Sequence, residues 1–140
     1  MGYKVNTHCP FAYSLEIFGD KWTLLILRQL LVCKNRYYDE FISGILEGIS
    51  TNILASRLKD MVANGLLSKR KDPENHARWI YEPTQKTLDL IPILIEIGIW
   101  ASKHDPETGV SPEVAEKFRH ERQAIISEWA KPFDTMLEYE

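Results

Sequence analysis

Apolar residues recur at helical spacing through most of this chain. In the first segment Phe11, Leu15 and Phe18 follow one another at intervals of four and three residues, which predicts a helix over about 9–19. The next segment, 21–32, is apolar on nearly every side. A helix of that kind belongs at the buried centre of a fold, so we expect this segment to form the core.

The pattern between residues 38 and 65 predicts two further helices joined by a tight turn. Residues 38–46 form the shorter helix, and a turn at 47–49 leads to Ser50, a favourable N-cap for the next helix. Gly65 provides a left-handed stop at the end of that helix. One face of the second helix is apolar and the opposite face is small and polar. The apolar face carries Leu54, Leu58 and Met61, and the polar face carries Asn52, Ser56 and Lys59.

Two short strands follow, over 66–71 and 77–81, and residues 72–76 between them have the composition of a turn. The order helix, turn, helix, strand, turn, strand predicts a winged helix-turn-helix. This fold is mainly α with a small β-hairpin wing. It places a polar helix face beside a basic hairpin, and the natural target of such a surface is duplex DNA.

The rest of the chain predicts helices again. A long helix is expected over 84–104, with a kink at Pro92, and a final amphipathic helix over 111–136. Both have more apolar surface than a small monomer can hide, and such an excess marks an interface. We therefore expect a homodimer that pairs through these helices and the first helix. The alternative is that the same residues cap the core of the monomer.

Composition places the chain among ordinary globular proteins. It has 140 residues, 44% hydrophobic and 26% charged, so we expect a single domain over 1–140 with a DNA-binding core at about 21–83. No apolar run reaches the roughly 18 residues of a membrane span, and the N-terminus lacks the apolar core of a signal peptide. We expect a cytoplasmic protein with no membrane partner.

The net charge of -3 argues against indiscriminate binding to nucleic acid, but the charges are unevenly distributed. Residues 51–81 contain six basic and three acidic side chains, whereas residues 111–140 contain four basic and seven acidic ones. A basic middle and an acidic end fit one face on DNA and another directed elsewhere. An ordinary mixed surface is the alternative explanation of the charge pattern.

Base edges in the major groove meet the first residues and the exposed face of a recognition helix. Asn52 is the predicted base contact, because its amide can pair with adenine, while Arg57 and Lys59 are expected at phosphates. The predicted DNA-binding set comprises Ser50, Thr51, Asn52, Ala55, Ser56, Arg57 and Lys59 on the helix, and Lys69, Arg70, Lys71 and Arg78 in the wing. A solvated helix face is the alternative for the helical residues, and a structural salt bridge is an equal alternative for Arg57.

One set of residues, spread over roughly 9–104, has a recognisable order and spacing. It comprises Cys9-Pro10, Gly19 to Leu27 with Leu30, Tyr38 to Phe41, Gly48 to Ser50, Leu54, Arg57-Leu58, Gly65-Leu66, Arg78, Tyr81 and Trp100. In these residues the chain resembles the HxlR family of winged helix-turn-helix transcriptional regulators, relatives of the MarR type. Pro83 and Thr87 depart from the family pattern at the entry to the long helix. The resemblance implies a sequence-specific regulator that binds a palindromic operator as a homodimer.

Some members of that family sense oxidants, quinones or aldehydes through a cysteine at the Cys-Pro position. Here Cys9 is the expected N-cap of the first helix, where free N–H groups and the helix dipole favour a thiolate. Modification of Cys9 would then change operator affinity. The alternative is that Cys9 is a small buried hydrophobe. Cys33 lies at the other end of its helix and is expected to be structural.

A small apolar ligand, bound between the DNA-binding unit and the terminal helices, is the alternative effector. The aromatic residues to consider there are Tyr13, Trp22, Trp79 and Trp100, although each is better explained as part of the core. The histidines have no metal-ligand spacing, and no phosphate-binding loop or nucleophile elbow occurs. We therefore predict no catalytic residue, metal or cofactor. A winged-helix adaptor that binds proteins is the remaining alternative, and the basic segment 51–81 argues against it.

Overall fold

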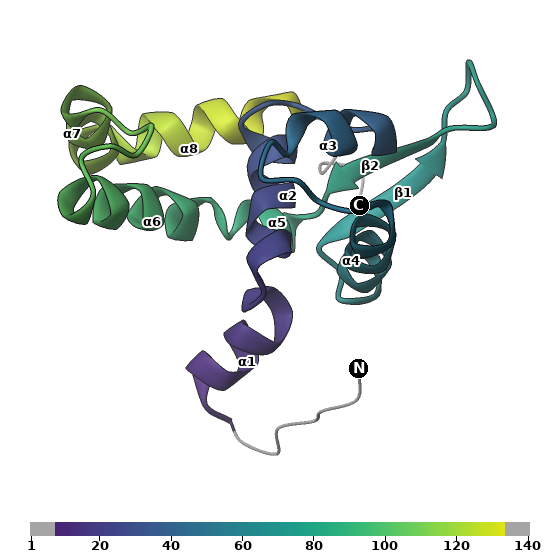
Figure 1. Ribbon diagram of the computed structural model, residues 1–140, viewed down its shortest axis with the longest axis horizontal. Coiled ribbons are helices and arrows are strands. Elements are labelled where there is room, and N and C mark those ends of the chain that lie inside the picture. Colours follow the sequence, from purple (N-terminus) through teal and green to yellow (C-terminus); the bar gives the residue numbers. More distant parts are fainter. Residues whose placement is uncertain (1–7, 134–140) are drawn as a thin grey trace. The chain divides into compact units, whose positions relative to one another are not determined.

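A computed structural model describes residues 8–133 of the chain. The chain separates into two compact units, residues 1–81 and 82–140. The described residues are mostly helical, with one two-stranded hairpin, which confirms the predicted fold class (Figure 1). The end of the last predicted helix, residues 134–136, lies outside the described residues. The division into a DNA-binding core and dimerisation helices stays a prediction.

Helices α1, Pro10–Phe18, and α2, Lys21–Leu31, form as the hydrophobic spacing predicts. The carboxylate of Asp20 caps α2 and accepts hydrogen bonds from the backbone N–H groups of Trp22 at 3.1 Å and Thr23 at 3.0 Å. This cap satisfies donors that every helix start leaves unpaired. Most of α2 is buried, which confirms its central position, whereas no residue of α1 is buried in the single chain.

Helices α3, Tyr38–Gly44, and α4, Thr51–Ala63, form the helix-turn-helix. The turn between them uses Gly48 at φ +85°, a conformation that residues with a side chain rarely adopt. Ser50 caps α4 as predicted, because its hydroxyl accepts a hydrogen bond from the N–H of Ile53 at 3.2 Å. The predicted apolar face of α4 is buried, and its buried residues are Leu54, Leu58 and Met61.

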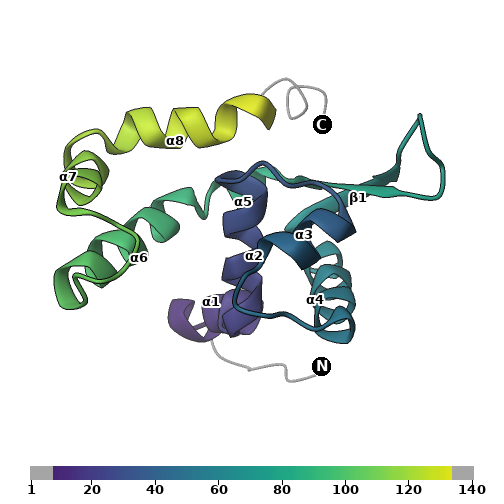
Figure 2. The same ribbon diagram turned by 45° about the horizontal axis from the view of Figure 1, so that its top comes forward.

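Strands β1, Leu67–Lys71, and β2, Trp79–Pro83, pair in a hairpin whose first strand packs beside α4 (Figure 2). Gly65, at φ +76°, turns the chain out of α4 as predicted. The turn between the strands is built on Asp72, whose carboxylate accepts a hydrogen bond from the N–H of Glu74 at 2.9 Å. The predicted wing is therefore confirmed, with strand ends shifted by one or two residues.

The predicted single helix over 84–104 is wrong. The structure has two helices there, α5 at Gln85–Leu88 and α6 at Ile91–His104. Pro92 is the physical reason: it lacks the N–H that would bond to the carbonyl of Leu88, and its ring would clash with that carbonyl in a continuous helix. Pro92 instead lies in the first turn of α6, where a missing N–H costs little. The expected kink is therefore a complete break.

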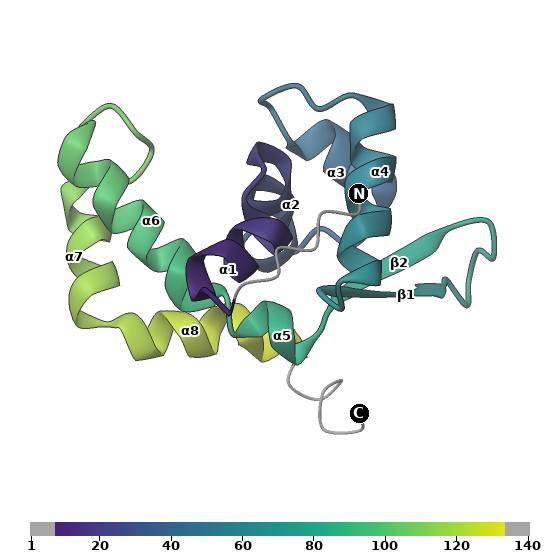
Figure 3. The same cartoon turned by 90° about the horizontal axis from the view of Figure 1, so that it is seen from below.

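The predicted single final helix is also wrong. Helices α7, Pro112–His120, and α8, Arg122–Ala130, are separated at Glu121, and a short 3-10 helix, Lys131–Phe133, follows. No proline or glycine marks this break in the sequence. Both α7 and α8 pack against α6 (Figure 3), and the change of direction at Glu121 lets each of them do so.

The close approach of α7 to α6 depends on a glycine. A Cβ added at Gly98 would lie 2.7 Å from the ring of Phe118, which is closer than packed atoms allow. The same ring meets Trp129 edge-on, with ring centroids 6.0 Å apart. Arg122 at the start of α8 forms an ion pair with Glu96 of α6. Side chains of all three helices therefore meet across the break between α7 and α8.

Candidate nucleic-acid interface

The outward face of α4 presents the residues that are predicted to read DNA. Ser50, Thr51, Asn52, Ala55, Ser56 and Lys59 are all exposed. Small polar side chains at a helix start allow close approach to base edges, and the backbone N–H groups there can bind a phosphate. The exposure agrees with the prediction, and the contacts with DNA stay a prediction.

Two contacts hold the start of α4 in place. The Tyr38 hydroxyl of α3 donates to the backbone carbonyl of Thr51 at 3.0 Å. The turn before α4 is braced by Arg28 of α2, whose guanidinium forms two hydrogen bonds with the carboxylate of Glu47, at 2.8 and 2.9 Å. The hydrogen bond from Arg28 lowers the pKa of Glu47 to about 2. These partners lie far apart in the sequence, and no periodic pattern marks them.

The guanidinium of Arg57 faces two carboxylates of the same chain. It lies 3.1 Å from the carboxylate of Asp60 and 4.0 Å from that of Asp20, the residue that caps α2. Arg57 therefore joins α4 to the start of α2. Of the two alternatives for this residue, these ion pairs favour the structural salt bridge over the phosphate contact.

The wing presents its lysines around one aromatic ring. The ammonium groups of Lys69 and Lys71 lie 4.6 and 4.9 Å from the centre of the Trp79 ring. Trp79 is 38% exposed, and the two lysines and Arg70 are also exposed. A cation above an aromatic face is held in place without losing its charge. The wing therefore has an ordered positive surface suited to a phosphate backbone.

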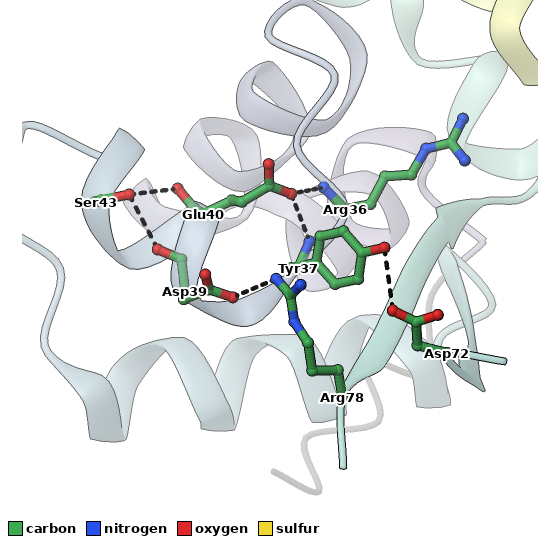
Figure 4. Close-up of polar contacts among 7 residues, drawn as sticks. All are labelled: Arg36, Tyr37, Asp39, Glu40, Ser43, Asp72 and Arg78. Atoms are coloured by element: carbon green, nitrogen blue, oxygen red, sulfur yellow. Dashed lines mark hydrogen bonds and ion pairs between the residues drawn. The ribbon is translucent and has the colours of Figure 1, made fainter. Parts of the chain in front are cut away.

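Arg78, at the other end of the wing turn, contacts two side chains of the same chain. Its guanidinium lies 3.6 Å from the centre of the Tyr37 ring and donates to the carboxylate of Asp39 at 2.9 Å (Figure 4). Tyr37 is the N-cap of α3, and Asp39 lies in the first turn of that helix. The sequence did not reveal these contacts, and the predicted contact of Arg78 with DNA stays a prediction.

The two cysteines are both free thiols on the surface. Cys9 is the N-cap residue of α1, as predicted, and it is exposed in the single chain, which does not fit the alternative of a small buried hydrophobe. Cys33 is also exposed, and its sulfur lies 3.7 Å from the side-chain oxygen of Gln29. Exposure leaves either thiol open to reagents in solution.

Three of the four aromatic residues that were expected in the core are exposed instead. Tyr13, Trp79 and Trp100 are exposed by 60%, 38% and 67%, and Trp22 is half-buried. Trp100 instead lines an apolar groove on α6 with a volume of about 440 Å³. The groove is lined by Pro92, Ile93, Glu96, Ile97, Trp100 and Arg122. Ile93, Ile97 and Trp100 follow one another at intervals of four and three residues, so α6 presents an apolar stripe along one face.

The HxlR-like helix-turn-helix family model matches residues 17–108, which include all of α2 through α6. The chain belongs to this family. The HxlR-like chain is 34% identical over 96 residues to YvaP, an uncharacterised helix-turn-helix-type transcriptional regulator of Bacillus subtilis (strain 168), and the match covers 68% of this chain and 87% of YvaP. It is 30% identical over 99 residues to YodB, a transcriptional regulator of the same organism, with 70% and 87% covered.

A solved structure supports the same assignment. The reduced form of YodB from B. subtilis superimposes with a TM-score of 0.58 at 27% identity, over 74% of this chain and 99% of that one. The family and its relatives are transcriptional regulators, so DNA binding is implied for this chain. Among the residues that the structure describes, no helix has the length and apolar character needed to cross a membrane.

Proposed function

We propose that this HxlR-like protein is a sequence-specific transcriptional regulator that binds a palindromic operator as a homodimer. The observation that carries the proposal is the exposed, small and polar start of α4 beside a hairpin that bears ordered lysines. A helix of this kind fits the major groove, and a cationic hairpin fits the adjacent backbone. Because one such unit reads only a few base pairs, two copies are needed for a specific site.

Within this proposal the residues of α4 have different tasks. Asn52 reads a base, since its amide offers one donor and one acceptor to adenine. The N–H groups near Ser50 and Thr51 hold a phosphate at the positive end of the helix dipole. Lys59 of α4 and Lys69 and Lys71 of the wing supply positive charge for the backbone, which acts on every sequence alike.

Exposed apolar side chains on two helices support the proposed dimer. On α6, Ile93, Ile97 and Trp100 are exposed by 37%, 44% and 67%. On α1, Phe11, Tyr13 and Leu15 are exposed by 77%, 60% and 63%. A monomer in water rarely leaves so many large apolar groups uncovered on neighbouring turns of a helix. A second copy of the chain would remove them from solvent.

The experiment that tests the proposal is a salt titration of binding to the DNA upstream of the protein's own gene. A regulator should bind one site tightly, and its affinity should fall linearly with salt on logarithmic axes. The variant with Asn52, Lys59 and Arg78 all replaced by Ala should lose this site. Specific binding that survives the triple replacement would contradict the assignment of the surface. A monomeric mass by light scattering at micromolar concentration would contradict the dimer.

Cys9 supports a second part of the proposal, a response to oxidants or electrophiles. Its thiol is exposed at the N-cap of α1, and the proposal is that this position beside the free N–H groups of the helix start makes Cys9 reactive. Iodoacetamide should therefore label Cys9 faster in the folded protein than in a denatured control. Oxidation should change the operator affinity of the parent protein and leave the operator affinity of the Cys9→Ser variant unchanged. Equal labelling rates would contradict the sensor and favour a regulator that responds to a small ligand.

A further inference from the structure

Tyr37 lies where the wing meets the helix-turn-helix, and its backbone is fixed by the first turn of α3. The carboxylate of Glu40 accepts hydrogen bonds from the N–H of Arg36 at 3.0 Å and from the N–H of Tyr37 at 3.1 Å (Figure 4). Such a bond pattern ties the chain before a helix to the helix itself. The Tyr37 ring therefore starts from a rigid position.

That one ring contacts both ends of the wing turn. The guanidinium of Arg78 stacks 3.6 Å from the ring centre, and the Tyr37 hydroxyl donates to the carboxylate of Asp72 at 3.4 Å. Asp72 and Arg78 are themselves joined, because the N–H of Asp72 donates to the carbonyl of Arg78 at 3.0 Å. The base of the wing turn is thus closed on itself and then fastened to a single side chain of the helix-turn-helix.

Two more contacts complete the attachment. Asp39, in the first turn of α3, accepts a hydrogen bond from Arg78 at 2.9 Å. On β2, the N–H of Tyr81 donates to the carbonyl of Arg36 at 2.8 Å. The hairpin is therefore held at two points three residues apart, and both lie next to the start of α3. Together with the packing of β1 beside α4, these two attachments fix the angle of the hairpin to the helices more firmly than either would alone.

We infer that Arg78 is a positioning residue, which holds the wing at a fixed angle to α3 and α4, and that Tyr37 and Asp39 are its partners in this task. The inference rests on the proposed function, because a fixed angle matters only when helix and wing engage the same duplex. A direct phosphate contact by Arg78 is the competing role. The two roles predict opposite results when Asp39 loses its charge.

Asp39 is the sharpest place to test the inference, because its side chain is 74% exposed and its replacement should leave the fold intact. Removing a negative charge near DNA should by itself strengthen binding. If Arg78 positions the wing, D39N should instead weaken operator binding about 3- to 10-fold, since Arg78 loses its charged partner and keeps only the stack on Tyr37. Glu74→Gln is the matched control: it removes an exposed charge from the same wing and should bind as the parent does or slightly more tightly.

The substitution R78K distinguishes the roles a second time. Lysine keeps the positive charge that a phosphate needs but loses the planar fork that stacks on Tyr37 and pairs with Asp39. A positioning role predicts that R78K binds as weakly as R78Q, and that the double variant D39N/R78K is no weaker than R78K alone. It also predicts that, in the free D39N and R78K variants, the backbone N–H groups of residues 72 and 74–78 move more than in the parent, as measured by nuclear magnetic resonance relaxation.

The possible results distinguish failure of the positioning role from failure of the proposed DNA-binding function. Binding by D39N that equals or exceeds that of the parent, or binding by R78K that equals that of the parent, would overturn the positioning role while leaving the DNA-binding function intact. Absence of specific binding by the parent protein would overturn the proposed function. In that case the relaxation of residues 72–78 in D39N and R78K still tests the attachment itself.

Discussion

Helix α4 in the first unit and helix α6 in the second treat their apolar side chains in opposite ways. In the first, α4 buries Leu54, Leu58 and Met61 and exposes small polar residues. In the second, α6 buries only Ile91 and Ile95, while Ile97 and Trp100 face solvent. The chemical character of the side chains that a helix exposes indicates which kind of partner can bind there. A polar helix beside a cationic hairpin suits DNA, and an apolar stripe suits protein.

The largest effect is expected in the core of the first unit. Leu54 is completely buried, so Leu54→Ala should lower the free energy of unfolding by about 2–5 kcal/mol, through reduced burial and the cavity left behind. Its neighbour Ile53 is 38% exposed, and Ile53→Ala should cost less than about 1 kcal/mol. Chemical denaturation at fixed protein concentration, followed by circular dichroism, measures both. Equal effects of the two substitutions would mean that α4 does not bury the face that carries Leu54.

A substitution in the apolar groove of α6 should change the dissociation constant of the dimer rather than the free energy of unfolding. Ile97→Asp places a charge in the groove of α6 and should weaken dimerisation by at least about 2 kcal/mol, roughly 30-fold, if this groove lies at the dimer interface. Analytical ultracentrifugation across a range of concentrations measures the dissociation constant. Lys103→Gln, on the exposed surface of the same helix, is the control and should leave it unchanged. A dimer that Ile97→Asp does not weaken would place the interface elsewhere.

On the polar side of the comparison, Asn52→Ala should change specificity more than affinity. The loss of one amide pair costs about 1–3 kcal/mol of discrimination between the operator and a site with that base replaced. Lys59→Ala should instead weaken binding to both sites alike and reduce the salt slope by about one unit for each phosphate that the lysine binds. Fluorescence anisotropy with the two duplexes at several salt concentrations separates these results. Unchanged discrimination in Asn52→Ala would remove it from base readout.

The smallest effect concerns the ion pair that braces the turn before α4. The pKa of Glu47 is lowered from 4.5 to about 2, so its stabilisation is present above pH 4.5 and is lost as the pH falls towards 2. The Glu47 side chain is 39% exposed, so solvent screening limits the contribution to about 1 kcal/mol or less. The difference in unfolding free energy between the parent and Glu47→Gln should therefore shrink on acidification. If the difference in unfolding free energy grew as the pH fell, the stabilising role of the Arg28–Glu47 ion pair would be contradicted.

The first unit was largely predictable because its signals are local. Apolar residues at intervals of three and four fix which face of α4 is buried, Ser50 marks its start and Gly65 its end. Each of these signals acts within a few residues of the feature it determines. The second unit was less predictable because no local signal marks the break at Glu121. Packing of both α7 and α8 on α6 accompanies that break, and such packing involves partners distant in the chain.

The amino-acid order alone determined the winged helix-turn-helix, the exposed polar face of α4 and the position of Cys9 at a helix start, because these depend on periodicity, capping and composition. Only the tertiary structure decided which partners within the chain the two arginines contact. Arg57 and Arg78 were both predicted to contact DNA, with a structural salt bridge as the alternative for Arg57, and folding places Arg57 beside Asp60 and Asp20 and Arg78 on Tyr37 and Asp39. An arginine reaches several ångströms from its backbone, so its partner is chosen by which elements fold together and not by its neighbours in sequence.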